Sequence, residues 1–144
     1  MADVVIDADV LVALLDENDS LSAQATALLA RLDADGHVPV VLDVLLGEAV
    51  SVLCRRAAER KANPPDLARA LDQARSWLER GEVAFVGRDQ ERLLGAMLDV
   101  VKETGGKVNV NDALLVVLQR EGSIGDVASF DKKLDTAVGF RRVS

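Results

Sequence analysis

Aromatic residues and cysteine are scarce in this sequence. It has three Phe, one Trp and no Tyr, so we expect a hydrophobic core built from Val, Leu and Ala. The one cysteine, Cys54, cannot form an internal disulfide, which suits a reducing cytosol. The longest apolar runs, 10–15 and 113–118, are far shorter than the roughly 20 residues of a membrane-spanning helix. The amino terminus, Met1-Ala2-Asp3, lacks the basic residues of a signal peptide. We therefore expect a cytoplasmic protein with no membrane association.

Basic residues are outnumbered by acidic ones. The 144 residues carry a formal net charge of −7, which argues against strong, nonspecific binding of nucleic acid through a basic surface. The charge leaves open an enzyme that contacts nucleic acid locally through a metal ion. The length predicts a single domain over residues 1–144.

Short apolar runs alternate with helical patterns along the chain. We expect Asp9, Ser20 and Asp43 to cap the helices that follow them, and Pro64-Pro65 to open a further helix. Either Asn109 or Asn111 is expected to open the last helix. This alternation predicts right-handed crossovers and therefore an α/β fold, with a parallel sheet covered by helices on both faces. Strands are predicted at 4–6, 38–42, 83–86 and 125–129, with a candidate edge strand at 140–143, and helices at 10–15, 21–35, 43–60, 65–80, 88–103 and 109–121.

Two aspartates follow predicted strands, and two further acids lie in apolar helical segments. Asp7 comes directly after the first strand, and Asp131 comes just after the fourth. Glu48 has apolar neighbours at helical spacing, which predicts that it lies on the buried side of its helix. Asp112 lies in the first turn of a helix that is apolar nearly all round. Ligands of such folds bind where parallel strands end, and we expect the four acids to meet there.

Each acid alone has an ordinary structural explanation. Asp7 and Asp131 suit turns, Glu48 suits the margin of a helix, and Asp112 suits the positive end of a helix dipole. Four carboxylates in one pocket would nevertheless repel one another unless a cation neutralised them. The simplest such cation is Mg²⁺ or Mn²⁺, because both ions bind carboxylate oxygens. An acidic pocket that holds such a metal indicates phosphate chemistry.

These residues resemble the motifs of the PIN domain family, specifically the short VapC-type toxins of toxin–antitoxin pairs. The resemblance covers essentially the whole chain. It departs from the family pattern at Asp9, where a small polar residue is frequent, and at Leu134, where an aromatic residue is common. The matching segments are Val5-Ile6-Asp7-Ala8-Asp9-Val10-Leu11, Leu46-Gly47-Glu48-Ala49-Val50, Asn111-Asp112-Ala113-Leu114-Leu115 and Ser129-Phe130-Asp131-Lys132-Lys133-Leu134-Asp135.

The resemblance implies a three-layer α/β/α fold around a central, mostly parallel sheet of four to five strands. It also implies a Mg²⁺- or Mn²⁺-dependent endoribonuclease. Asp7, Glu48, Asp112 and Asp131 match the family's four acids, and would be both the catalytic residues and the metal ligands. Water would attack the RNA phosphodiester and leave 5′-phosphate and 3′-hydroxyl ends. The resemblance further implies a homodimer that is silenced by a small cognate antitoxin protein.

Several points stay open at this stage. The residues do not indicate which RNA is cut, or whether one metal or two are bound. They also leave open whether Asp9, Ser129 or Asp135 joins the site.

Two other functions compete with this interpretation. Asp7-Ala8-Asp9 after a strand resembles the paired aspartates of haloacid-dehalogenase-type phosphatases, in which one aspartate is the nucleophile and the other the acid and base. Leu11 departs from that family's pattern, and the chain has little room for its inserted cap. The second competitor is a PIN-fold binding module that has kept its acids but does not turn over a substrate.

Overall fold

The computed structural model describes residues 2–59 and 62–144, and its centre is a parallel sheet. Five strands pair in the order β3-β2-β1-β4-β5, and every pairing is parallel. The strands are β1 (Asp3–Ile6), β2 (Val38–Leu42), β3 (Val83–Ala84), β4 (Val127–Ala128) and β5 (Arg142–Val143).

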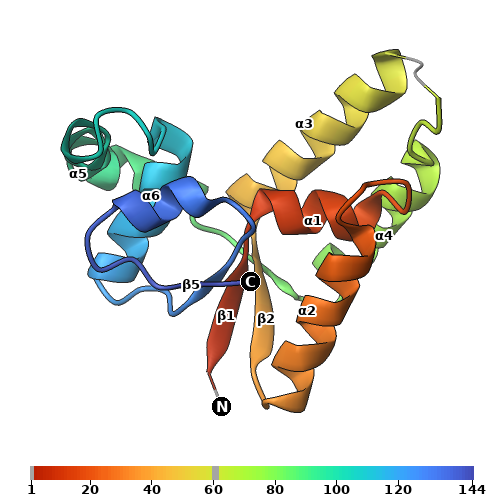
Figure 1. Cartoon of the computed structure of the whole chain (residues 1–144), viewed down its shortest axis with the longest axis horizontal. Coiled ribbons are helices and arrows are strands. Elements are labelled where there is room, and N and C mark those ends of the chain that lie inside the picture. Colours follow the sequence, from red (N-terminus) through yellow and green to blue (C-terminus); the bar gives the residue numbers. More distant parts are fainter. Residues whose placement is uncertain (1, 60–61) are drawn as a thin grey trace.

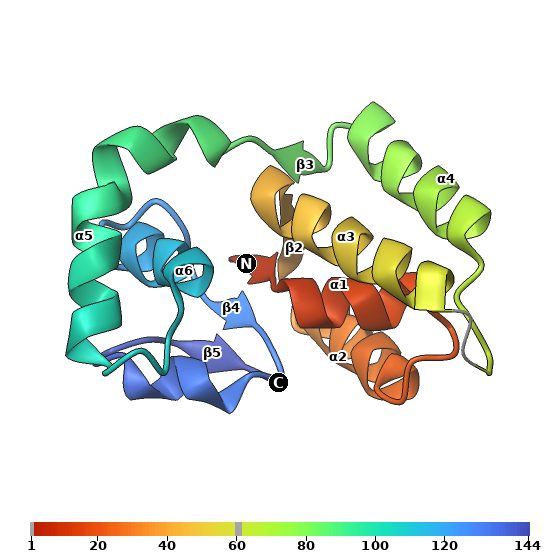
Figure 2. The ribbon, with the colours of Figure 1, turned by 90° about the horizontal axis from the view of Figure 1, so that it is seen from above.

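Helices cover both faces of this sheet. One group contains α1 to α4, and the other contains α5 and α6, with the sheet between them (Figures 1 and 2). The predicted three-layer α/β/α architecture is therefore confirmed. The helical elements are α1 (Ala8–Leu15), α2 (Ser22–Ala34), α3 (Asp43–Glu59), α4 (Leu67–Glu79), η1 (Gly87–Asp89), α5 (Gln90–Glu103), α6 (Val110–Arg120) and η2 (Lys132–Thr136).

The order of the strands places a switch point between β1 and β4. The chain builds outward from β1 through β2 to β3, and then returns across the other face to add β4 and β5 on the opposite side of β1. In open α/β sheets, ligands bind beyond the carboxyl ends of the strands at such a point. Asp7 follows β1 directly, and Asp131 lies three residues beyond β4.

The sheet is held by a core of small and branched side chains. All three apolar residues of β1 are at most 2% exposed, and α6 is buried without interruption from Ala113 to Gln119. This burial explains why α6 has an apolar residue at almost every position: it packs on α5, and its buried residues join the same hydrophobic core as those of β1 and β4. Within residues 2–59 and 62–144, no helix has the length and apolar character needed to cross a membrane.

Three of the predicted strands are shorter than expected. β3 ends at Ala84 rather than at residue 86, because the Val86 N–H donates to the Asp43 carboxylate (2.8 Å) and Phe85 is 61% exposed. β4 and β5 have two residues each, because the pairing of β4 with β1 and that of β5 with β4 each extend over only two positions. Only β2 has the predicted bounds throughout.

Several predicted helix caps were wrong. The carboxylate of Asp7, rather than that of Asp9, caps α1. Ser20 does not cap α2, which begins at Ser22 after Leu21 and has no side-chain cap. Helix α4 begins after Asp66, whose carboxylate accepts a hydrogen bond from the Arg69 N–H.

Two further boundary predictions concern α3 and α6. Asp43 is the first residue of α3, and its carboxylate accepts hydrogen bonds from Val86 and Gly87 instead of capping that helix. The structure describes α3 through Glu59, and the predicted end near Arg60 lies outside the described residues. The sequence offered Asn109 or Asn111 as the residue that opens α6, and the structure selects Asn109, whose side chain accepts a hydrogen bond from the Asp112 N–H (2.9 Å).

Candidate metal centre

Asp7 is a buried carboxylate at the carboxyl end of β1. Its side chain is held from two directions: Oδ1 accepts a hydrogen bond from the Ala8 N–H (2.8 Å), and Oδ2 accepts one from the Ser129 hydroxyl (2.6 Å). Asp7 is only 5% exposed. Burial raises the pKa of Asp7, against the effect of these two hydrogen bonds, and the nearby charge of Asp131 raises it further.

Ser129 connects the two strand ends of the switch point. Its Oγ donates to Asp7 and accepts a hydrogen bond from the Asp131 N–H (3.0 Å), and the serine is fully buried. The Asp131 carboxylate in turn accepts from the Lys133 N–H (3.0 Å) and thereby caps η2. A single hydroxyl therefore fixes the position of one predicted ligand and the backbone of another.

Asp112 approaches the same site from α6. Its pKa is raised to about 7, first by burial and then by the negative charges of Asp7, Glu48, Asp131 and Asp9, in that order. Such charges act on a carboxyl group beyond direct contact, over distances up to roughly 10 Å in physiological salt. The four predicted acids, which come from four different segments of the chain, therefore lie near enough to interact through their charges.

Glu48 lies at the edge of this group, where the sequence prediction was wrong. We expected its side chain on the buried side of α3, but Glu48 is exposed, and Leu45, Ala49 and Leu53 form the buried side. Apolar neighbours three and four positions away do not place Glu48 on the buried side of α3, because Val44 and Val52 are themselves only partly buried. Partial burial of the carboxyl group, followed by the charge of Asp7, still raises the pKa of Glu48.

Asp9 is a fifth acid in the centre. Its Oδ2 accepts a hydrogen bond from the Phe130 N–H (3.0 Å), while its Oδ1 is buried and, among the described residues, has no hydrogen-bond partner. Burial and then the charge of Asp7 raise the pKa of Asp9 to about 6. The sequence left open whether Asp9 caps a helix or joins the site, and its charge acts on the Asp112 carboxyl group within the centre.

Asp135 lies outside the acidic group. Its exposed carboxylate is paired with Arg142, whose Nε and Nη2 donate to the two carboxylate oxygens (3.0 and 2.9 Å). Arg142 also donates from Nη1 to the Ser129 carbonyl (2.9 Å), and its side chain is only 12% exposed. The neighbouring Arg141 is directed away and pairs with Asp126 instead, so the alternation of β5 decides which of the two arginines faces the centre.

The side chains present fit a divalent cation. Apart from the guanidinium of Arg142, the side-chain polar groups of the centre are carboxylates and one hydroxyl, the oxygen donors that Mg²⁺ and Mn²⁺ prefer. The partnerless Oδ1 of Asp9 and the raised pKa of Asp112 both indicate negative charge that nearby cations such as Arg142 offset only in part. In the described part of the chain, however, no three His, Cys, Asp or Glu side chains already form a metal-binding cluster. The acids are therefore coupled by charge, without an arrangement at coordination distance.

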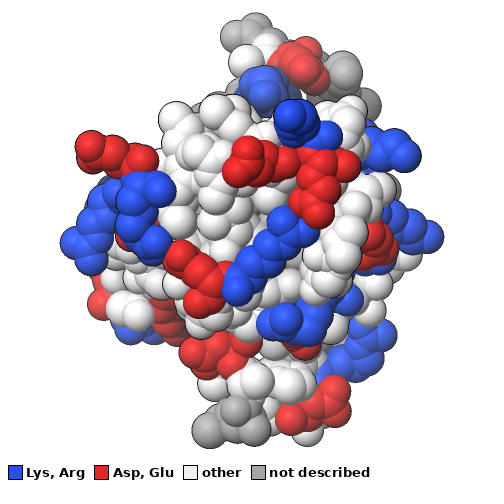
Figure 3. All heavy atoms as spheres, turned by 90° about the vertical axis from the view of Figure 1, so that its left-hand side faces the viewer, with Lys and Arg blue, Asp and Glu red and all other residues white. Residues whose placement is uncertain are grey.

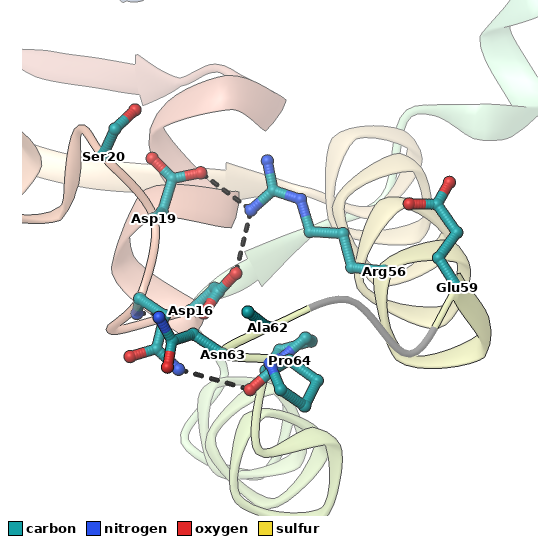
Figure 4. A pocket seen from close by; sticks show the side chains of 10 residues that line it. Asp16, Asp19, Ser20, Arg56, Glu59, Ala62, Asn63 and Pro64 are labelled. Atoms are coloured by element: carbon teal, nitrogen blue, oxygen red, sulfur yellow. Dashed lines mark hydrogen bonds and ion pairs between the residues drawn. The ribbon is translucent and has the colours of Figure 1, made fainter.

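A separate hollow of about 300 Å³ lies between the α1–α2 connection, α3 and the segment before α4, and it contains none of the predicted site residues. Arg56 points into it and donates from Nη1 to Asp16 (2.9 Å) and Asp19 (2.8 Å), as Figure 4 shows. Because two carboxylates already balance this guanidinium, and Asp16 is only 3% exposed, the hollow is a structural junction between these segments.

Comparison with known proteins identifies the family of this fold. A model of the PIN domain family matches residues 4–139. The chain belongs to the PIN domain family. No curated protein sequence matches this PIN domain.

Two solved structures share its fold. The Mycobacterium tuberculosis toxin VapC20, described as cleaving the sarcin–ricin loop, has 23% sequence identity and a TM-score of 0.66, over 97% of this PIN domain and 98% of the toxin chain. A chain of VapBC2 from Rickettsia felis, bound to a DNA fragment from the promoter, has 12% identity and a TM-score of 0.61, over 98% and 97% of the two chains. At these identities the likeness concerns the fold.

Proposed function

We propose that this PIN domain is a metal-dependent endoribonuclease and the toxin of a toxin–antitoxin pair. The observation that carries the proposal is the position of Asp112. Its carboxyl group lies near enough to Asp7, Glu48 and Asp131 for their negative charges to raise its pKa. Three of the four acids come from the carboxyl ends of strands or from the first turn of a helix, at the switch point where α/β proteins bind ligands.

In this proposal Asp7, Glu48, Asp112 and Asp131 hold Mg²⁺ or Mn²⁺. When bound, such an ion neutralises charge on a phosphodiester and lowers the pKa of coordinated water. Ser129 acts on the protein side by keeping Asp7 and the backbone of Asp131 in place. Asp9 adds negative charge to the same centre.

RNA is the proposed substrate. The side of the molecule seen in Figure 3 has basic and acidic side chains interspersed with uncharged surface, and no continuous basic face. With a net charge of −7, the protein would bind RNA mainly at the metal centre and through local contacts. The fold is shared with a toxin that cleaves the sarcin–ricin loop, which supports RNA over a small phosphate ester.

The proposed partners are a cognate antitoxin and a second copy of the chain. The fold is shared with VapBC2, which was solved with a fragment of its promoter DNA, and this supports an antitoxin partner. Leu94 and Leu98 are about half exposed on one side of α5, an apolar surface that a homodimer would cover. A cytoplasmic location goes with this proposal, because the substrate would be cellular RNA.

The sequence was also compatible with two functions other than a nuclease, a phosphatase and a binding module. Membership of the PIN domain family favours the nuclease over the phosphatase that Asp7 and Asp9 suggested. The binding module differs from the nuclease only in turnover, so an activity measurement separates them.

The test is cleavage of a mixed RNA pool in Mn²⁺ by the wild type, Asp131→Asn and Asp126→Asn. Asp126→Asn is the matched control, because Asp126 pairs with Arg141 away from the centre. We expect Asp131→Asn to reduce cleavage at least a hundredfold and Asp126→Asn to cleave at nearly the wild-type rate. Cleavage by folded Asp131→Asn at the wild-type rate would contradict the assigned site, and a wild type without metal-dependent cleavage would favour the binding module.

A further inference from the structure

A recess borders Glu48 on the side of α5 and α6. It has a volume of about 250 Å³ and lies between the beginnings of α3, α5 and α6. Core packing fixes its floor, so the recess is formed before any ligand arrives. The floor contains three side chains that are each 2% exposed: Leu45, Met97 and Leu114.

Two amide side chains stand at the rim of this recess. Gln90 is the first residue of α5, and Asn111 lies in the first turn of α6, next to Asp112. Both are exposed, and neither amide group has a hydrogen-bond partner among the described residues. Each amide offers a donor and an acceptor side by side to a ligand in the recess.

The charges around the recess exclude a phosphate as its occupant. None of the described side chains that line it is basic, and Glu48 contributes a carboxylate. An anion would therefore be repelled. A neutral, flat group with a polar edge fits better, since it can cover the apolar floor and reach the two amides at the rim.

The place of the recess connects it with the metal centre. Glu48 lines both this recess and a second one on the side of α1, which contains Asp9 and Arg56. Glu48 thus lies between two hollows, and Asp9 lines the second of them. A strand of RNA with one phosphate at the acids would bring its neighbouring nucleotides over them.

Resting on the proposed function, we propose that the recess between α3, α5 and α6 holds one nucleobase beside the scissile phosphate. Gln90 and Asn111 hydrogen-bond to the edge of that base and thereby set which sequences are cut. Single-stranded RNA is recognised in this way, by contact with the flat faces of its bases and by hydrogen bonds to their edges. An amide pairs with neighbouring donor and acceptor groups such as those of adenine.

The experiment measures cleavage of short single-stranded RNAs that are randomised at every position, with sequencing of the product ends. It compares the wild type with Gln90→Leu, Asn111→Leu and Gln73→Leu. Gln73 is the matched control, because it is an exposed amide on α4 outside the recess. Gln90→Glu is a further variant, which keeps the shape of the side chain but removes its donor.

We expect the wild type to prefer particular bases at one position next to the cut. Gln90→Leu and Asn111→Leu should reduce that preference about tenfold at this position alone, the lower end of the discrimination that one amide–base pair supplies. Gln90→Glu should change which base is preferred there, and Gln73→Leu should leave the pattern unchanged. Mn²⁺ affinity, measured by calorimetry without RNA, should be unaltered in Gln90→Leu.

Two results would overturn the inference, and they differ in their meaning. A wild type that cuts with a preference that none of the recess variants changes would remove the base-binding role and leave the nuclease intact. A wild type that cuts no RNA in Mn²⁺ would remove the proposed function and this inference with it.

Discussion

Replacing Asp112 by Asn should stabilise the metal-free protein. The carboxyl group of Asp112 lies among four other acids and accepts no hydrogen bond from the described residues. The N–H that donates to Asn109 belongs to its backbone and is kept in the variant. Asp112→Asn therefore removes a repelled negative charge without breaking a bond or changing the shape of the side chain.

The size of this gain in stability, and its dependence on pH, follow from the raised pKa of Asp112. A rise from 3.8 to about 7 corresponds to about 4 kcal/mol, at roughly 1.4 kcal/mol per pH unit. Solvent reaches part of this group and screens the charges of its neighbours. We therefore expect Asp112→Asn to raise the free energy of unfolding by about 2 kcal/mol. The folded state binds the proton more tightly than the unfolded state, so the wild type loses stability as the pH rises from about 4 through about 7. The gain from Asp112→Asn should thus be small at pH 4 and complete at pH 8.

The assay is urea unfolding in EDTA at pH 4, 6 and 8, for the wild type, Asp112→Asn and Asp99→Asn. Asp99 is an exposed acid on α5, away from the centre, and serves as the control. We expect Asp99→Asn to follow the wild type at each pH. The claim that neighbouring negative charges destabilise ionised Asp112 would be refuted by either of two results. Asp112→Asn could be no more stable than the wild type at pH 8, or its gain in stability could be equal at all three pH values.

Two further substitutions test other parts of the structure. Ser129→Ala removes the hydrogen bond to Asp7 and should weaken Mn²⁺ binding in calorimetry about tenfold, as losses of such supporting groups commonly do; unchanged affinity would show that Ser129 does not position the acids. Arg56→Met leaves Asp16 buried without a cation and should lower the free energy of unfolding by about 2 kcal/mol, because Arg56 itself stays partly exposed. The exposed pair of Arg69 and Glu17 is the control for that measurement, and a loss no larger than that of Arg69→Met would contradict a structural role for Arg56.

The sequence predicted those features that depend on local pattern. The continuous apolar run of α6 required burial on more than one side, and the residue types indicated that Asn109 or Asn111 would open it, of which Asn109 does. The bounds of β2 were predicted because its five residues end at the start of α3. Asp7 and Asp131 were proposed as site residues because each follows an apolar run in the sequence, and the structure places Asp7 directly after β1 and Asp131 three residues beyond β4.

The features that were missed depend on contacts between distant segments. Asp43 was expected to cap its own helix, but Val86 and Gly87, more than 40 residues away, supply better-placed donors. Asp9 was expected to cap α1, whereas its carboxylate binds the Phe130 N–H, 121 residues away. No local pattern contains these partners, because tertiary packing selects them. The same holds for Arg142, whose role depends on which neighbour β5 meets in the sheet.

The central claim is that Asp7, Glu48, Asp112 and Asp131 together bind one kind of divalent cation. The most direct test is anomalous diffraction from crystals of the protein grown with Mn²⁺. The account predicts an anomalous peak within about 2–2.5 Å of carboxylate oxygens from these acids. No peak at the carboxyl ends of β1 and β4, with the four carboxylates pointing apart, would contradict it.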